Sequence, residues 1–195
     1  MMKIGLTGNI GSGKTLVSLV FEALGIPVFN ADEEAKKLIN SPPILSKLDK
    51  KFGMCVKDSE GKLNHKVLAD IIFADPEALA FVNAIVHPAV RNCFNEWCQS
   101  YSHESFVIFE AAILIETSFY KQLDKIVLVK APENIRMQRV VDRDRIFPEK
   151  VLARMKNQWS EEEKQKFAHF VIINDGSNPV VAQCLAVYKE LIASC

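Results

Sequence analysis

A glycine-rich segment at residues 8–15 constrains the fold of this chain more than any other part of the sequence. Its letters, GNIGSGKT, satisfy the pattern G-x-x-x-x-G-K-[ST] between an apolar run at 3–7 and an amphipathic stretch at 14–24. Such a loop between a strand and a helix presents backbone N–H groups and the positive end of the helix dipole to a phosphate. Lys14 would then reach the β- and γ-phosphates of a nucleotide, and the Thr15 hydroxyl would coordinate Mg²⁺. The segment predicts a P-loop nucleotide-binding fold.

Short apolar runs alternate with helical patterns along the whole chain. We expect strands at 3–7, 26–30, 105–109, 125–129 and 170–173. Continuous apolar strands separated by helices indicate a parallel sheet covered by helices on both faces. The predicted fold is therefore an α/β three-layer sandwich with a central parallel sheet. Strands are missing from 31–101 and 136–165, which predicts helical insertions at the carboxyl edge of the sheet, where open α/β folds bind ligands.

These patterns predict one P-loop unit over 1–195 with two inserted segments. Its core would comprise about 1–30, 102–135 and 166–195. Helix ends follow from breakers and caps. We expect 41–43, with its two prolines, to end a helix that begins at Ala31, and Pro88 to kink a helix or start another. Ser160 and Glu163 have the spacing of a capping box.

Composition excludes several classes of protein. The 24 basic and 24 acidic side chains balance, which argues against a broad nucleic-acid-binding surface. No apolar run approaches the roughly 18–20 residues that span a bilayer, and we expect neither a membrane segment nor a signal peptide. The five cysteines are odd in number and form no C-x-x-C pair, as a protein of the reducing cytoplasm would have. They are Cys55, Cys93, Cys98, Cys184 and Cys195. A monomer is the expectation, with a small homo-oligomer as the alternative.

Other P-loop classes fit the sequence less well. A GTPase switch needs N-K-x-D, which is absent, and the D-x-x-G match at 58–61 follows no strand and is typical of a solvated turn. A motor or transporter ATPase needs an apolar strand ending in Asp-Glu, whereas the strand here ends in Glu110 alone. Glu110 would either lie near Mg²⁺ through water or cap the strand end, and both interpretations stay open.

Asp32 follows the second expected strand directly. If that strand lies next to the first strand or one removed from it, Asp32 is beside the phosphate loop. A carboxylate there can accept the proton of a substrate hydroxyl as it attacks the γ-phosphate. The alternative is that Asp32, Glu33 and Glu34 are acidic residues that complement a helix dipole.

The arginines are concentrated in one short stretch. Of six in the chain, five lie between 136 and 154. Arg136, Arg139 and Arg143 share one helical face, and guanidinium groups suit the charge on phosphoryl oxygens. We assign Arg139 and Arg143 to phosphate contact, on a mobile flap that excludes water from the reaction. Arg136 and Arg145 are better explained as a solvated face paired with nearby acids. These acids are Asp142, Asp144 and Glu149.

Taken together, these residues resemble the dephospho-coenzyme A kinase family, P-loop kinases related to nucleoside monophosphate kinases. The resemblance covers essentially the whole chain. The matching segments are 4–15, 25–32, His87 with Pro88, 114–116, Arg139 through Arg143 and Asp144, Arg154 with Gln158, and 173–176. It implies a P-loop core, a helical domain at 31–101 that holds dephospho-coenzyme A, and a lid at 136–165. It also implies transfer of the ATP γ-phosphate to the ribose 3′-hydroxyl, the last step of coenzyme A synthesis.

The resemblance also assigns residues. Asp32 matches the catalytic aspartate of the family, 174–176 match a loop near the ATP adenine, and His87 matches the substrate side, although a helix-end role for His87 stays open. The predicted catalytic residues are Asp32, Lys14 and Arg143. Those expected to bind ATP are Gly8, Asn9, Gly11, Ser12, Gly13, Lys14, Thr15, Leu16, Arg139, Asn174 and Gly176. Those expected to bind the acceptor are Asp32, His87 and Glu110, and Thr15 is the metal ligand.

Three positions depart from the family pattern. Asn30 stands where the family often has aspartate, Ala112 where it often has proline, and Leu16 where Ser or Thr is usual. The backbone N–H of Leu16 can still contribute to phosphate binding. Two other functions compete: a P-loop kinase acting on a nucleoside monophosphate or a polyol acid, and a non-catalytic nucleotide-binding regulator. Asp32 and the clustered arginines favour a kinase, and the long insertion favours a large acceptor.

Overall fold

The computed structural model describes residues 1–53, 56–58 and 60–194. Three residues of the sequence patterns above, Cys55, Ser59 and Cys195, lie outside this part of the chain. The chain divides into two compact units, which we describe separately. The first contains Met1–Asn30 and Ser100–Cys195, and the second contains Ala31–Gln99.

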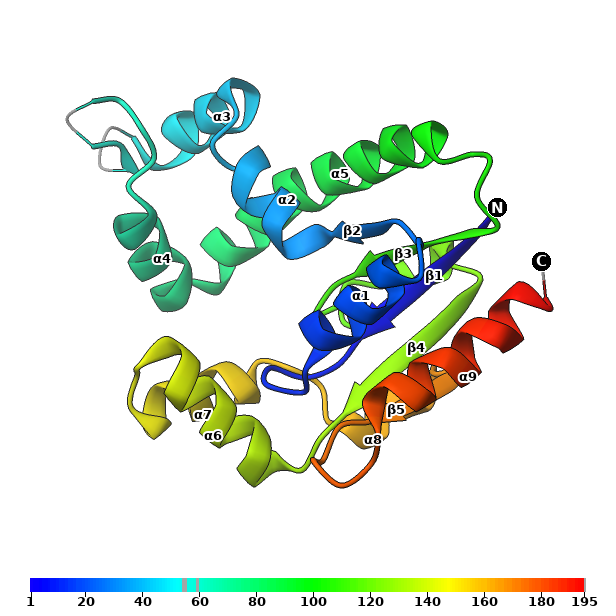
Figure 1. The fold of residues 1–195 in the computed structure, drawn as a ribbon. Helices are drawn as coiled ribbons and strands as arrows, with labels where there is room; N and C mark the ends of the chain where they lie inside the picture. Colours follow the sequence, from blue (N-terminus) through cyan, green and yellow to red (C-terminus); the bar gives the residue numbers. More distant parts are fainter. Residues whose placement is uncertain (54–55, 59, 195) are drawn as a thin grey trace. The chain divides into compact units, whose positions relative to one another are not determined.

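The first unit is built on a parallel sheet of five strands (Figure 1). The strands are β1 (Met2–Thr7), β2 (Val28–Asn30), β3 (Phe106–Glu110), β4 (Lys125–Lys130) and β5 (Phe170–Ile173). Their order is β2-β3-β1-β4-β5, and every pairing is parallel. The predicted parallel sheet is therefore confirmed. Only β2 is shorter than expected, because Pro27 has no N–H to donate to a neighbouring strand.

Alternate residues of each strand face opposite sides of the sheet. On one side, Ile4 and Leu6 of β1 are buried with Val17 and Phe21 of α1 (Lys14–Ala23). The helix α9 (Val180–Ile192) adds Leu191 to the same cluster. Figure 1 shows α1 and α9 side by side over this face. The apolar stripe of each helix therefore packs against the apolar face of the sheet.

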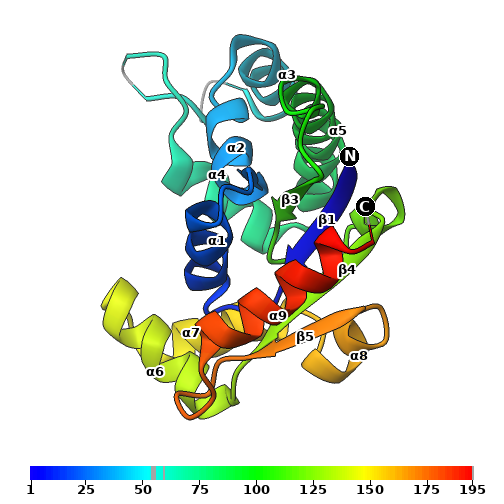
Figure 2. The same ribbon diagram turned by 45° about the vertical axis from the view of Figure 1, so that its right-hand side comes forward.

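The other side of the sheet is covered by the chain that follows β3. The ring of Phe119, at the start of the short helix η2 (Phe119–Gln122), stacks on Phe109 with ring centroids 4.1 Å apart. The helix α8 (Glu161–Gln165) packs against β4 and lies beside β4 and β5 in Figure 2. Helical segments thus cover both faces, as a three-layer sandwich requires.

Two further helices precede α8 in the first unit. They are α6 (Glu133–Asp144) and α7 (Pro148–Lys156). The predicted capping box at the start of α8 is confirmed. Ser160 Oγ accepts from the N–H of Glu163 at 3.2 Å, and Glu163 Oε2 accepts from the N–H of Ser160 at 2.9 Å.

The described residues of the second unit form helices and their connections, apart from one bridge between Lys57 and Leu63. Its helices are α2 (Ala31–Leu38), α3 (Pro42–Phe52), α4 (His65–Ala74) and α5 (Pro76–Ser100, whose last residue belongs to the first unit). The helix that begins at Ala31 ends at Leu38, before the prolines at 42 and 43, as expected. These prolines also start α3, because proline is favoured in a first helical turn. The helix α5 continues through Pro88. In the described part of the chain, no helix combines the length and the apolar character that a membrane crossing requires.

Candidate active site

The phosphate loop at 8–15 leaves the end of β1 and enters α1. Gly11 and Gly13 have φ angles of 80° and 95°, in the left-handed region that favours glycine. A Cβ atom on Gly11 would collide with the backbone of Arg136, and one on Gly13 with the side chain of Asn174. The first bond within α1 joins the N–H of Val17 to Gly13 O, so the earlier N–H groups have no intrahelical acceptor. The loop therefore has the conformation that anion binding needs.

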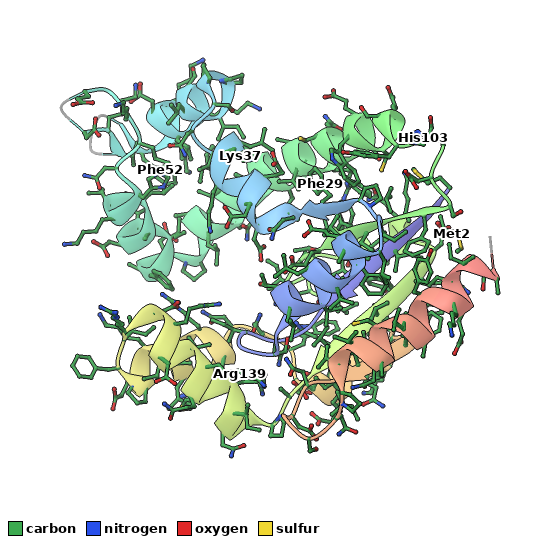
Figure 3. All side chains as sticks on the ribbon, viewed as in Figure 1. Met2, Phe29, Lys37, Phe52, His103 and Arg139 are labelled. Carbon is green, nitrogen blue, oxygen red and sulfur yellow. The ribbon has the colours of Figure 1, made fainter. Side chains whose placement is uncertain are left out.

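Cationic and amide side chains contact the carbonyl oxygens of this loop. Lys14 Nζ donates to Gly8 O at 3.0 Å, and Arg139 Nη1 donates to Gly11 O at 3.3 Å. In Figure 3 the labelled Arg139 lies on α6 next to the loop. The structure thus brings two cations that the sequence assigned to ATP to one short segment. Thr15 and Leu16 follow in the first turn of α1, and the side chain of Leu16 is exposed.

Asn174 connects the loop to the end of β5. Its Nδ2 donates to Ser12 O at 2.8 Å, and its Oδ1 accepts from Arg139 Nη2 at 3.3 Å. The side chain is buried. Gly176 follows in a turn that Asp175 closes by accepting from the N–H groups of Asn178 and Ser177. These bonds lower the pKa of Asp175 to about 2.

Glu110 is buried at the carboxyl end of β3, with 5% of its surface exposed. Its Oε2 accepts from Ser18 Oγ and from Asn30 Nδ2, both at 3.1 Å. Ser18 lies one helical turn after Thr15 on α1, and Asn30 ends β2. The carboxylate therefore connects α1 to two strands. Ser18 is not among the site residues predicted from the sequence, although a hydroxyl on the buried face of an apolar helix is a signal that could identify it.

Arg136 does not lie on a solvated face, so that prediction is wrong. Only 6% of its surface is exposed. Its Nε donates to Ala131 O at 2.9 Å and lies 3.3 Å from Glu161 Oε1, while its Nη2 is 4.0 Å from Glu133. The ion pair with Glu161 links the first turn of α6 to α8, which the helical periodicity could not reveal. Burial raises the pKa of Glu161, and the charge of Arg136 opposes that shift.

Arg143 has a different environment from Arg139. Its Nε lies 2.7 Å from Asp144 Oδ1, and Arg154 Nη1 lies 2.7 Å from the other carboxylate oxygen of Asp144. Hydrogen bonding to Arg143, and then to Arg154, lowers the pKa of Asp144. The Arg143 side chain is 62% exposed. One carboxylate thus joins the end of α6 to α7.

Two predicted site residues, Asp32 and His87, belong to the second unit. Asp32 is the second residue of α2, which begins directly after β2. The strand β2 is one removed from β1, with β3 between them, which is one of the two arrangements that the argument for Asp32 required. His87 is half-buried in α5, and burial, together with the charge of Arg91, lowers its pKa.

Two further residues contact the phosphate loop. The N–H of Ile10 donates to Gln158 Oε1 at 2.8 Å, and Asn9 Nδ2 donates to Trp159 O at 3.1 Å. Gln158 is among the residues that match the family, but the sequence predicts no role for Gln158 or Trp159. A separation of 148 residues between Ile10 and Gln158 leaves no periodic signal, so only the folded chain reveals this contact.

Magnesium would have to be held mainly by the nucleotide. The described residues contain no group of three or more His, Cys, Asp or Glu side chains that could hold a metal ion. Oxygen ligands are nevertheless present in the hydroxyl of Thr15, within the loop, and in the buried carboxylate of Glu110, at the end of β3. Mg²⁺ prefers oxygen ligands and is often bound through one or two protein groups plus substrate phosphates. The donor set fits this mode of binding.

Comparison with known proteins gives a consistent result. A family model described as dephospho-CoA kinase matches residues 2–179. A dephospho-CoA kinase of Bacteroides fragilis (strain YCH46) is 43% identical over 193 residues, which cover 98% of this chain and 92% of the relative. A solved dephospho-CoA kinase from Campylobacter jejuni has a TM-score of 0.73 at 26% identity, covering 98% of both chains. The Thermus thermophilus protein TT1252 has a TM-score of 0.85 at 35% identity, covering 99% and 97%.

Proposed function

The chain belongs to the dephospho-CoA kinase family, and on this basis we propose that it transfers the γ-phosphoryl group of ATP to the ribose 3′-hydroxyl of dephospho-CoA. The products are coenzyme A and ADP. The observation that carries the proposal is the phosphate loop, where Lys14 and Arg139 donate hydrogen bonds to loop carbonyl oxygens. The family model matches the chain over residues 2–179.

The phosphate loop would bind ATP by exchanging hydrogen bonds. The N–H groups at the start of α1 are suited to the β-phosphate. Lys14 and Arg139 would leave the loop carbonyls for phosphate oxygens, which gives stronger, charge-assisted bonds. Asn174 and Gly176 would lie near the adenine. Mg²⁺ would be held by the Thr15 hydroxyl and phosphate oxygens, with Glu110 close behind, and when bound it neutralises charge on the transferring group.

We assign the catalytic base to Asp32. As the 3′-oxygen forms its bond to the γ-phosphorus, its proton passes to the Asp32 carboxylate. The bond between the γ-phosphorus and the bridging oxygen breaks, and its electron pair leaves with ADP. Lys14 and Arg143 stabilise the charge that develops on the phosphoryl oxygens. Arg143 would first have to exchange Asp144 for phosphate.

The two inserted segments have separate roles in this proposal. The segment at 31–101 holds the acceptor, with His87 as a contact whose lowered pKa, caused by burial, favours the uncharged imidazole. The segment at 136–165 acts as the lid and excludes water, so that the phosphoryl group passes to the acceptor rather than to water. We further propose that the chain works as a monomer in the cytoplasm, and size-exclusion chromatography tests the oligomeric state.

One assay tests the proposed activity. The purified chain is incubated with Mg-ATP and one acceptor at a time: dephospho-CoA, a nucleoside monophosphate, or a polyol acid. The expected result is ADP release with dephospho-CoA and formation of coenzyme A, identified by mass spectrometry. Phosphorylation of another acceptor would assign a different kinase activity. ATP hydrolysis with no phosphorylated acceptor would refute the kinase proposal.

A further inference from the structure

The first half of the phosphate loop is held from outside by the residues that precede α8. Gln158 Oε1 accepts from the N–H of Ile10 at 2.8 Å, and Trp159 O accepts from Asn9 Nδ2 at 3.1 Å. Asn9 is buried, with 5% of its surface exposed. Ile10 has no predicted contact with the nucleotide, whereas Asn9 is among the residues expected to bind ATP, and its side-chain amide is held here by Trp159.

The segment at 158–159 is itself anchored by a buried ion pair. The N–H of Trp159 donates to Glu116 Oε1 at 3.0 Å, and the same oxygen lies 2.9 Å from Lys164 Nζ. Lys164 also donates to Ala112 O at 2.7 Å. The Lys164 side chain is fully buried, and the Glu116 side chain is 14% exposed. A continuous chain of bonds thus runs from the segment after β3, through Trp159, to the phosphate loop.

A buried ion pair is a poor way to gain stability. Removing two charges from water is costly, and apolar residues of similar volume are often as stabilising or more so. Burial lowers the pKa of Lys164 even beside Glu116, which indicates that the environment opposes its charge. The pair does, however, fix geometry. Glu116 Oε1 accepts from the N–H of Trp159 while it pairs with Lys164, and this holds the backbone of Trp159 at one place relative to the segment after β3.

The opposite end of the 136–165 segment holds the next loop residue. Arg139 Nη1 donates to Gly11 O at 3.3 Å, and the backbone of Arg136 lies so close to Gly11 that only glycine fits. In this structure, the three consecutive residues Asn9, Ile10 and Gly11 are therefore held by both ends of one segment, and the Arg139 bond is the one that a phosphate would replace. A displacement of either end must move the loop.

We propose that Gln158, Trp159 and the buried Glu116–Lys164 pair are positioning residues that keep the phosphate loop in its nucleotide-binding conformation. They act on nucleotide affinity through Asn9 and Ile10 and do not contact the nucleotide. The inference rests on the proposed function for the nature of the ligand. We further infer that the lid segment and the phosphate loop move together when a nucleotide binds, because the ends of that segment and the loop share these bonds.

Gln158→Met tests the inference without disturbing the buried charges. Methionine has similar length and no strong acceptor for the N–H of Ile10. We expect the dissociation constant for Mg-ADP, measured by isothermal titration calorimetry, to rise about 3- to 10-fold, as the loss of one partly buried hydrogen bond predicts. Gln138→Met is the matched control on α6, since Gln138 donates to Asp142 and not to the loop. Its affinity for Mg-ADP should equal that of the parent chain.

A spectroscopic measurement separates positioning from general stability. The chain has two tryptophans, and Trp97→Phe leaves Trp159 as the one emitter. Trp97 stacks on Phe94, so phenylalanine is a conservative replacement. Mg-ADP should change the Trp159 emission in this background, and adding Gln158→Met should shift the titration midpoint about 3- to 10-fold higher. An unchanged emission would show that Trp159 does not respond to the loop.

The outcomes distinguish this inference from the proposed function. Equal Mg-ADP affinities for Gln158→Met, Gln138→Met and the parent chain would overturn the positioning role while leaving the kinase proposal intact. A parent chain that binds no Mg-ADP would refute the nucleotide site itself, and the inference with it. A fall in melting temperature at unchanged affinity would assign Gln158 a purely structural role, which also overturns the inference.

Discussion

Asn30→Asp tests how the buried site around Glu110 tolerates charge. In the native chain, Asn30 Nδ2 donates to Glu110 Oε2 at 3.1 Å, beside a second bond from Ser18. The substitution replaces this donor with a carboxylate oxygen at nearly the same place. Two carboxylates would then face each other where Glu110 is 5% exposed. The change is of particular interest because the resemblance to the dephospho-CoA kinase family leads us to expect aspartate at this position.

The magnitude follows from the distance. Unit charges 3–4 Å apart repel by about 4–5 kcal/mol at an effective dielectric constant of about 20. Such a pair retains one proton, and the repulsion corresponds to a pKa raised by about 3 units, from about 4 to about 7. At a pH between these two pKa values, the folded variant binds one more proton than the unfolded chain. Its free energy of unfolding therefore falls by about 1.4 kcal/mol per pH unit as the pH rises.

Urea unfolding between pH 4 and pH 8 measures this effect. Asn30→Ala is the control, because it removes the donor without adding charge and should cost about 1 kcal/mol at every pH. The variant Asn30→Asp should be close to this control near pH 4 and about 3–4 kcal/mol less stable at pH 8. Adding Glu110→Gln exchanges donor and acceptor between the two positions, and should abolish the pH dependence.

The reasoning is refuted if Asn30→Asp and Asn30→Ala differ by the same amount across this pH range. It is also refuted if the variant gains stability on going from pH 4 to pH 8, since the sign of the proton linkage would then be opposite. If the prediction is correct, the amide at position 30 is the complement of a carboxylate at position 110. The departure from the family pattern would then be a compensated exchange rather than a lost ligand.

Three other predictions concern separate residues. Asp32→Asn should lower kcat about 10²–10⁴-fold and leave the affinity for Mg-ADP nearly unchanged. Steady-state kinetics and calorimetry measure these two quantities, and an unchanged kcat would mean that Asp32 only complements the helix dipole. Arg143→Ala should lower kcat more than it raises the KM for ATP, because the proposed contact strengthens in the transition state, and equal effects would instead indicate ground-state anchoring of ATP. Asp175, with its pKa lowered to about 2, should stabilise the fold fully above its unfolded pKa of about 4, and this contribution should be lost as the pH falls through about 2. A carboxyl NMR titration measures that pKa directly, and a midpoint near 4 would mean that the backbone bonds from Ser177 and Asn178 do not form in solution.

The sequence predicted the sheet well because its signals are local. The run at 170–173 matches β5 residue for residue, and the capping box at Ser160 forms as expected. The prolines at 42 and 43 gave an ambiguous signal, since proline is compatible both with the end of one helix and with the first turn of the next. Only the structure shows that they start α3.

The part of the candidate site that could not be predicted depends on packing between distant segments. Periodicity correctly placed Arg136 and Arg139 on one helical face, yet it could not identify what that face packs against. One arginine is buried beside Glu161, and the other reaches Gly11. Gln158 likewise reaches Ile10 across 148 residues. Such contacts join segments that are far apart in the sequence, and no sequence spacing encodes them.

The contacts of the phosphate loop also bear on how a chain with no net charge can bind a polyanion. Lys14, Arg139 and Asn174 donate to three loop carbonyls at 3.0, 3.3 and 2.8 Å. Their side chains are therefore ordered beside the predicted phosphate site, and little further conformational entropy is lost when a nucleotide binds. Exchanging a carbonyl for a phosphate oxygen replaces an ordinary acceptor with a charged one, which strengthens the bond. Affinity then depends on a few preorganised donors at one loop and not on the overall charge of the protein.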